Sequence, residues 1–133
     1  MTMTDWRTLE AGPELDANVA ERVFGWTGCQ VQHGRFAGYP PNSGQFTFGR
    51  PYSTDIAAAW LVVERMRDRG YWVRIEDYTD GWRVTFSVPS KDEPDDWLND
   101  VMLSEAGTMP AAVCDAALEV LEAHERPHGA AHD

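Results

Sequence analysis

The segment that decides the fold reads Tyr71-Trp-Val-Arg-Ile-Glu-Asp-Tyr-Thr-Asp-Gly-Trp-Arg-Val-Thr-Phe-Ser-Val88. Apolar and polar residues alternate on both sides of Thr79-Asp80-Gly81, and an Asp-Gly pair between two such runs indicates a tight β-hairpin. Alternate side chains of a strand point to opposite faces. The face that we expect to pack against helices carries Tyr71, Val73, Ile75, Trp82, Val84, Phe86 and Val88. The other face, which we expect to be half exposed to solvent, carries Trp72, Arg74, Glu76, Tyr78, Arg83, Thr85 and Ser87.

A helix is predicted immediately before this hairpin, over residues 54–69. Ser53-Thr54-Asp55 supplies side chains that cap its first turn, and Gly70 ends it. The apolar stripe that we expect to face the core consists of Ile56, Trp60, Val63 and Met66, with Arg67 at its edge. On this prediction Trp60 is a core residue.

Two further helices are predicted from the same helical periodicity. The first spans residues 13–24: Pro13 suits its first turn, and its apolar face carries Leu15, Val19 and Val23. The last begins at Thr108-Met109-Pro110 and ends before Pro127, and its apolar stripe consists of Val113, Ala117, Val120 and Leu121. Cys114 lies beside this stripe, so we expect a buried, reduced thiol.

Residues 27–53 separate the first two helices and are rich in Gly, Pro and aromatic residues. The sequence predicts a long loop here, with a short strand over residues 45–48. Structureless loops of this length are uncommon in compact domains and are usually functional or disordered. Disorder is disfavoured by the five aromatic residues Phe36, Tyr39, Phe46, Phe48 and Tyr52.

The remaining segments complete an α+β fold class. Residues 91–100 are acidic and contain Pro94, so a loop is predicted, anchored to the core by Trp97, Leu98, Val101, Met102 and Leu103. We expect one domain over residues 1–126 and a mobile tail at 127–133. The predicted order is helix, loop, helix, strand, strand, helix, with the helices packed on one small antiparallel sheet as an α-β-α sandwich.

The formal charge of −11 is concentrated near the C-terminus, where residues 90–133 carry eleven acidic and two basic residues. Duplex nucleic acid is therefore an unfavourable partner, because phosphate binding requires a basic patch. No apolar run reaches the roughly 18–20 residues of a membrane span, and the first residues lack the pattern of a signal peptide. We expect a soluble cytoplasmic protein without a membrane partner.

No motif points to catalysis, a metal or a cofactor. Cys29 and Cys114 lack the spacing of a zinc or redox site. Three histidines fall at a helical spacing, but Pro127 and Gly129 interrupt the helix that would align them; they are His124, His128 and His132. We therefore predict a protein that is not an enzyme and that holds no cofactor or metal.

Three blocks of the chain together resemble a known family. They are Ala11-Gly-Pro-Glu-Leu-Asp-Ala-Asn-Val-Ala-Glu-Arg-Val-Phe-Gly-Trp26, Pro51-Tyr-Ser-Thr-Asp-Ile-Ala-Ala-Ala-Trp-Leu-Val-Val-Glu64 and Met109-Pro-Ala-Ala-Val-Cys-Asp-Ala-Ala-Leu118. With the hairpin they cover about residues 11–122 and resemble the phage ABA sandwich domain, found in small phage and prophage proteins. The resemblance implies an α+β domain with helices on a small sheet, and a viral or prophage source. It implies no catalytic or binding residue.

The aromatic segment is the most informative candidate site. Flat bases stack on aromatic rings, and Arg can stack on a base as well as hold a phosphate. The candidate ligand-binding residues are Arg35, Phe36, Tyr39, Phe46, Phe48, Arg50 and Tyr52. The alternative is that the segment only covers the hydrophobic core.

Together with the resemblance, these residues favour a non-enzymatic, phage-encoded counter-defence protein. We expect it to capture a small nucleotide-type signal in the host cytoplasm and to form a homo-oligomer. The other hypothesis is an acidic inhibitor that docks residues 90–133 on a basic host nuclease or effector.

Overall fold

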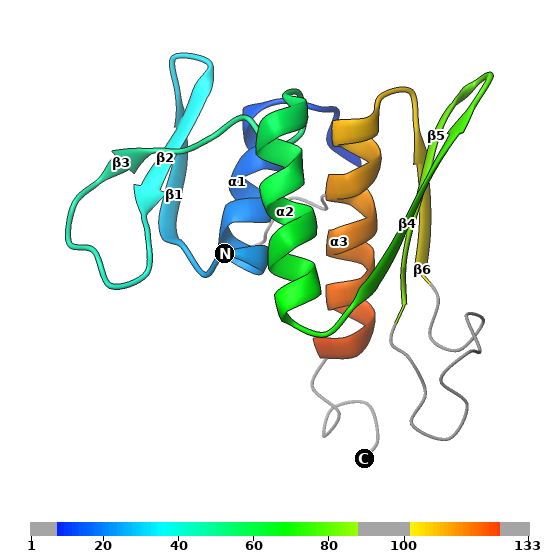
Figure 1. Ribbon diagram of the computed structural model, residues 1–133. Helices are drawn as coiled ribbons and strands as arrows, with labels where there is room; N and C mark the ends of the chain where they lie inside the picture. The colour runs from blue at the N-terminus through cyan, green and yellow to red at the C-terminus, as the bar shows by residue number, and fades with distance from the viewer. Residues whose placement is uncertain (1–7, 88–101, 126–133) are drawn as a thin grey trace.

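The computed structural model describes residues 8–87 and 102–125 as three helices and six strands. The helices are α1 (Pro13–Val23), α2 (Ile56–Asp68) and α3 (Met109–Glu125). Sheet A consists of β1 (Thr27–Gln32), β2 (Arg35–Tyr39) and β3 (Thr47–Phe48), and sheet B of β4 (Trp72–Tyr78), β5 (Gly81–Ser87) and β6 (Met102–Ala106). The two sheets lie on opposite sides of the helices (Figure 1). The predicted α+β class is confirmed, but the helices pack with two small antiparallel sheets and not with one.

The central helix of the hydrophobic core is α3. It contacts α1, α2, β5 and β6, and a helix that is covered on several sides is apolar around most of its circumference. Its predicted stripe is buried, and so are Ala112, Cys114 and Ala116 between the predicted positions. Cys114 is a free, buried thiol, as the sequence predicts.

The second predicted helix is confirmed as α2, but its buried face differs from the prediction. Asp55 caps the helix, because its carboxylate accepts a hydrogen bond of 2.9 Å from the backbone N–H of Ala58. Ile56 and Trp60, predicted in the core, are 65% and 44% exposed. The buried residues are Ala58, Ala59, Val62, Val63 and Met66. The small alanines allow α3 to pack closely on this side, and the two larger side chains are turned away from the core.

The predicted hairpin is confirmed as β4 and β5 of sheet B. Val73 lies opposite Phe86 and Ile75 opposite Val84, as the alternation requires. Phe86 and Val84 are completely buried. A third strand, β6, pairs with β5 over residues that the sequence assigned to a loop anchor. Because β5 is a central strand and not the edge of a two-stranded hairpin, Thr85 and Ser87 on the outer face are buried where half exposure was predicted.

The prediction of a long loop over residues 27–53 is wrong, because most of this segment forms sheet A. β1 and β2 make a hairpin whose turn is His33 and Gly34, with φ values of 53° and 77°. Two successive residues with positive φ are typical of the tight turns that match the twist of paired strands. The short strand expected over 45–48 is present as β3, which pairs with β2. Sheet A lies against α1.

Some predictions concern residues outside the described ranges. They are the loop at 91–100 with Trp97 and Leu98, the anchor at Val101, and the tail at 127–133 with His128 and His132. Within the described ranges, no helix has the length and hydrophobicity needed to cross a membrane.

Candidate functional site

Two of the seven candidate ligand-binding residues, Phe36 and Tyr52, belong to the hydrophobic core and not to a surface. Phe36 is 2% exposed and Tyr52 is 4% exposed. The ring of Tyr52 stacks on Phe24 with centroids 5.0 Å apart, and the ring of Phe36 meets Trp26 edge-on at 5.4 Å. The alternative that the aromatic segment covers the core therefore holds for these two residues.

Gly49 allows Phe36 to take this position. A Cβ atom on residue 49 would lie 1.8 Å from Cζ of Phe36, so the ring packs directly against the glycine backbone. The backbone N–H of Gly49 donates a hydrogen bond of 3.0 Å to the carbonyl oxygen of Phe36. This close approach fixes the end of β3 beside β2.

Three other candidates form an exposed aromatic cluster on the side of sheet A that faces away from the helices. Tyr39, Phe46 and Phe48 are 40–47% exposed. The rings of Tyr39 and Phe46 are 5.3 Å apart at 59°, and the guanidinium of Arg35 lies 4.3 Å above the ring of Phe48. We call these four residues the outer face of sheet A. Ala37 pairs with Phe48 in the register, so by alternation Phe48 lies on the same face of sheet A as Arg35 and Tyr39.

Arg35 also lines a cavity at the edge of sheet A, together with the remaining candidate, Arg50. The cavity has a volume of about 270 Å³ and is further lined by Asp16, Gly34, Phe36, Gly49 and Pro51. The cavity therefore brings both candidate arginines together beside Asp16 of α1. The sequence did not connect α1 with these arginines.

The carboxylate of Asp16 is held in place by Ser53, a contact that sequence reasoning missed. Asp16 Oδ1 accepts hydrogen bonds from Ser53 Oγ at 2.6 Å and from Ser53 N at 2.7 Å. Ser53 Oγ in turn accepts one from the backbone N–H of Gly12 at 2.8 Å. Burial raises the pKa of the Asp16 carboxyl, although both hydrogen bonds from Ser53 lower it. Ser53 thus joins the start of α1 to the segment before α2, while Asp55 alone caps α2.

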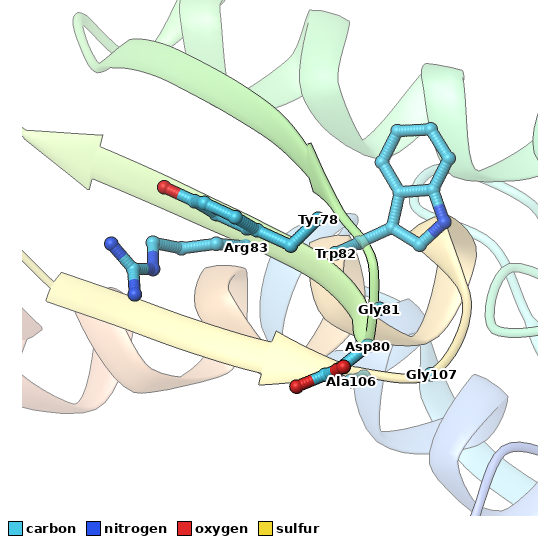
Figure 2. A pocket seen from close by; sticks show the side chains of 7 residues that line it. All are labelled: Tyr78, Asp80, Gly81, Trp82, Arg83, Ala106 and Gly107. Carbon is cyan, nitrogen blue, oxygen red and sulfur yellow. The ribbon is translucent and has the colours of Figure 1, made fainter.

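A second cavity, of about 430 Å³, lies at the turn between β4 and β5 (Figure 2). The guanidinium of Arg83 lies 4.8 Å from the centre of the Tyr78 ring. Figure 2 shows Tyr78 and Arg83 side by side, with Trp82 on the opposite side of the hairpin. Asp80 also lines this cavity. The charge of Arg83 is thus offset by the carboxylate of Asp80, and the cavity offers a single exposed ring. For both reasons it suits an aromatic or anionic ligand less well than sheet A does.

Metal-ligating and thiol side chains are the other groups of interest in the sequence. No group of three His, Cys, Asp or Glu residues among them could hold a metal ion. Burial raises the pKa of Cys29 to about 12 and that of Cys114 well above its usual value. Both side chains are therefore thiols at neutral pH, whereas the thiolate is the reactive form.

Comparison with known proteins gives one match. A family model described as the Phage ABA sandwich domain matches residues 17–118, which is more than half of the chain. Neither the curated proteins nor the solved structures contain a match.

Proposed function

The chain belongs to the Phage ABA sandwich domain family, and we propose that it is a binding protein that captures a small nucleotide-type ligand on the outer face of sheet A. One observation carries this proposal: this face exposes three aromatic rings, with those of Tyr39 and Phe46 5.3 Å apart and the guanidinium of Arg35 4.3 Å above that of Phe48. Tyr39, Phe46 and Phe48 account for three of the seven large hydrophobic side chains that are exposed among the described residues.

The chemistry of these side chains suits a flat, charged ligand. Stacking of a base on an aromatic ring contributes roughly 1–3 kcal/mol and tolerates different bases. A guanidinium group can lie parallel to a ring and also donate hydrogen bonds to a phosphate.

We propose capture without chemical conversion; burial raises the pKa of both described thiols, so neither supplies a thiolate nucleophile. For a protein of a phage family, the fitting role is counter-defence: removal of a nucleotide signal that the host cell produces. We also propose a homo-oligomer. The exposed pair Ile56 and Trp60 on α2 supports it, since a second copy could cover this apolar surface.

The test is calorimetric titration of the wild-type protein with a panel of cyclic nucleotides and ADP-ribose derivatives. Phe48→Ala should lower the affinity of the ligand that binds by about tenfold or more, because a stacking surface is lost. Tyr78→Ala is the matched control: Tyr78 is equally exposed and also lies beside an arginine, but on sheet B. Equal losses in the two variants, or no binding by the wild type, would contradict the proposal.

The acidic inhibitor is the alternative outcome of this experiment. Its basis is the charge of residues 90–133, with eleven acidic and two basic residues. If no nucleotide binds and the protein instead retains a basic host nuclease or effector at low salt but not at high salt, the acidic inhibitor replaces nucleotide capture. Exposed charges are screened at high ionic strength, so this interaction must be salt-sensitive.

A further inference from the structure

We propose that the cavity between Arg35 and Arg50 is an anion site that holds a phosphate group of the ligand whose base stacks on the outer face of sheet A. This inference rests on the proposed nucleotide binding and adds a second subsite to it. The cavity measures about 270 Å³. Pockets that enclose a whole small ligand span roughly 300–1,000 Å³, so this one suits a part of a nucleotide, with the remainder outside.

The two arginines are available to an anion. The chain carries 22 acidic and 11 basic residues, so carboxylate partners are abundant. Yet Arg35 and Arg50 form no ion pair with any residue in the described ranges. An arginine pair that faces one cavity without carboxylate partners is suited to an anionic ligand, since a guanidinium forms paired hydrogen bonds with phosphate.

Other arginines of the chain have a visible structural role. Arg69 Nη2 donates a hydrogen bond of 2.7 Å to the carbonyl oxygen of Val23 at the end of α1, and Arg65 Nε donates one of 3.4 Å to the same oxygen. These two side chains satisfy a helix terminus and join α2 to α1. No comparable contact involves the side chains of Arg35 and Arg50 within the described part of the chain.

Asp16 also lines the cavity but does not neutralise the arginines. Its Oδ1 atom accepts both hydrogen bonds from Ser53, at 2.6 and 2.7 Å. The carboxylate of Asp16, in the first turn of α1, is thus held by two neutral donors, the hydroxyl and the backbone N–H of Ser53. Two arginines and one aspartate line the cavity, so its lining carries a net positive charge, which favours an anion.

Arg35 connects the two proposed subsites. Its guanidinium lies over the ring of Phe48 on the outer face, and the same residue lines the cavity. A base on the outer face and a phosphate in the cavity would therefore lie on either side of one side chain. Arg50 lines the cavity but does not belong to the outer face of sheet A. A substitution of Arg50 should therefore affect phosphate binding and leave base stacking unchanged.

The first experiment tests the anion site without any base. Inorganic phosphate is titrated into ¹⁵N-labelled full-length protein at constant ionic strength, with chloride as the reference anion. The expected chemical-shift changes concentrate on the amides of Gly34 and Gly49, which line the cavity, and saturate. They should disappear in Arg50→Ala and persist in Arg67→Ala, which removes the same charge from the exposed surface of α2. Shifts spread evenly over all arginine-bearing surfaces, or no shifts, would overturn the anion site.

The second experiment separates the two subsites. Adenosine 5′-monophosphate and adenosine are titrated into the wild type, Arg50→Ala and Phe48→Ala. Arg50→Ala should weaken binding of the monophosphate about tenfold and leave adenosine unchanged, because only a charge-assisted contact is lost. Phe48→Ala should weaken both. Unchanged monophosphate binding in Arg50→Ala would overturn the cavity as the phosphate subsite and leave nucleotide capture intact. If phosphate shifts the amides of Gly34 and Gly49 but no nucleotide binds, the cavity is an anion site and the proposal of nucleotide capture is overturned.

Discussion

Sheets A and B are both three-stranded and antiparallel, yet they use their aromatic residues in opposite ways. Sheet B buries Val84 and Phe86 against the helices and exposes one ring, that of Tyr78. Sheet A inserts one ring, that of Phe36, into the core and exposes three rings on its outer face. Both sheets place an arginine over an exposed ring: Arg83 lies 4.8 Å from the Tyr78 ring in sheet B, and Arg35 lies 4.3 Å from the Phe48 ring in sheet A. Sheet B is thus mainly a structural layer, whereas sheet A combines one core anchor with the surface for which we propose ligand binding.

The largest expected effect tests whether both sheets are anchored in the same way. Phe36→Ala and Phe86→Ala should each lower the free energy of unfolding by about 3–5 kcal/mol, because each removes a fully buried ring. Urea denaturation measures both values. A much smaller loss in Phe36→Ala would break the comparison, since sheet A would then contribute little to the core.

A smaller loss is expected from Gly49→Ala, which tests how sheet A accommodates its anchor. The added Cβ would overlap the ring of Phe36, and overpacking of this kind typically costs about 1–3 kcal/mol. Gly44→Ala is the control, because a Cβ there meets no atom within 4 Å. Thermal and urea denaturation should separate the two variants; equal stability would mean that Phe36 can move without cost.

The exposed rings of the two sheets should contribute similarly to stability and differently to binding. Phe48→Ala and Tyr78→Ala should each lower the free energy of unfolding by about 1 kcal/mol or less, because both rings are about half exposed. Only Phe48→Ala should weaken nucleotide binding. A large loss of stability in Phe48→Ala would show that the outer face of sheet A is a structural element.

The smallest expected effect is a pH dependence of stability that involves one partly buried acid on α3 and one buried acid on α1. Burial raises the pKa of Asp115 on α3 to about 6, and burial also raises the pKa of Asp16 on α1. Between about pH 4 and pH 6 the unfolded chain ionises Asp115 while the folded protein keeps it protonated, so stability falls as the pH rises. Asp115 is partly exposed, and solvent screening limits the change to less than about 1 kcal/mol.

Asp115→Asn should therefore flatten the decline in stability between pH 4 and pH 6. Urea denaturation at a series of pH values measures this effect. Asp16→Asn should act in the same direction on the α1 side, while it retains an oxygen acceptor for Ser53. If either variant steepens the decline, the assigned direction of that pKa shift is wrong.

Sheet B could be predicted from the sequence because its residues follow the simple rule of one apolar and one polar face. The alternation through Val84 and Phe86 survives in the structure, and the Asp-Gly signal marks the turn. Sheet A does not follow the rule, since its exposed face carries aromatic rings. Its glycines, moreover, make room for these rings: a Cβ on Gly28 would lie 3.2 Å from the ring of Tyr39. In the sequence the same glycines are typical of a loop.

The candidate site was predicted in part. The sequence grouped Tyr39, Phe46 and Phe48 with the two arginines, but it could not separate these exposed rings from Phe36 and Tyr52 in the core. The face of α2 shows the same difficulty, since Ile56 and Trp60 fit a helical stripe but lie outside the core. Nothing in the sequence connected Asp16 with Arg50.

The sequence by itself determined the three helices, the Asp55 cap of α2 and the hairpin of sheet B. Each of these depends on residues a few positions apart, because backbone hydrogen bonds, caps and turns act over short distances. Only the tertiary structure decided which aromatic rings are buried and which residues line the cavity, since burial depends on the elements that pack on each face. Asp16, Arg35 and Arg50 come from three separate segments of the chain, and they share one cavity because sheet A folds back onto α1.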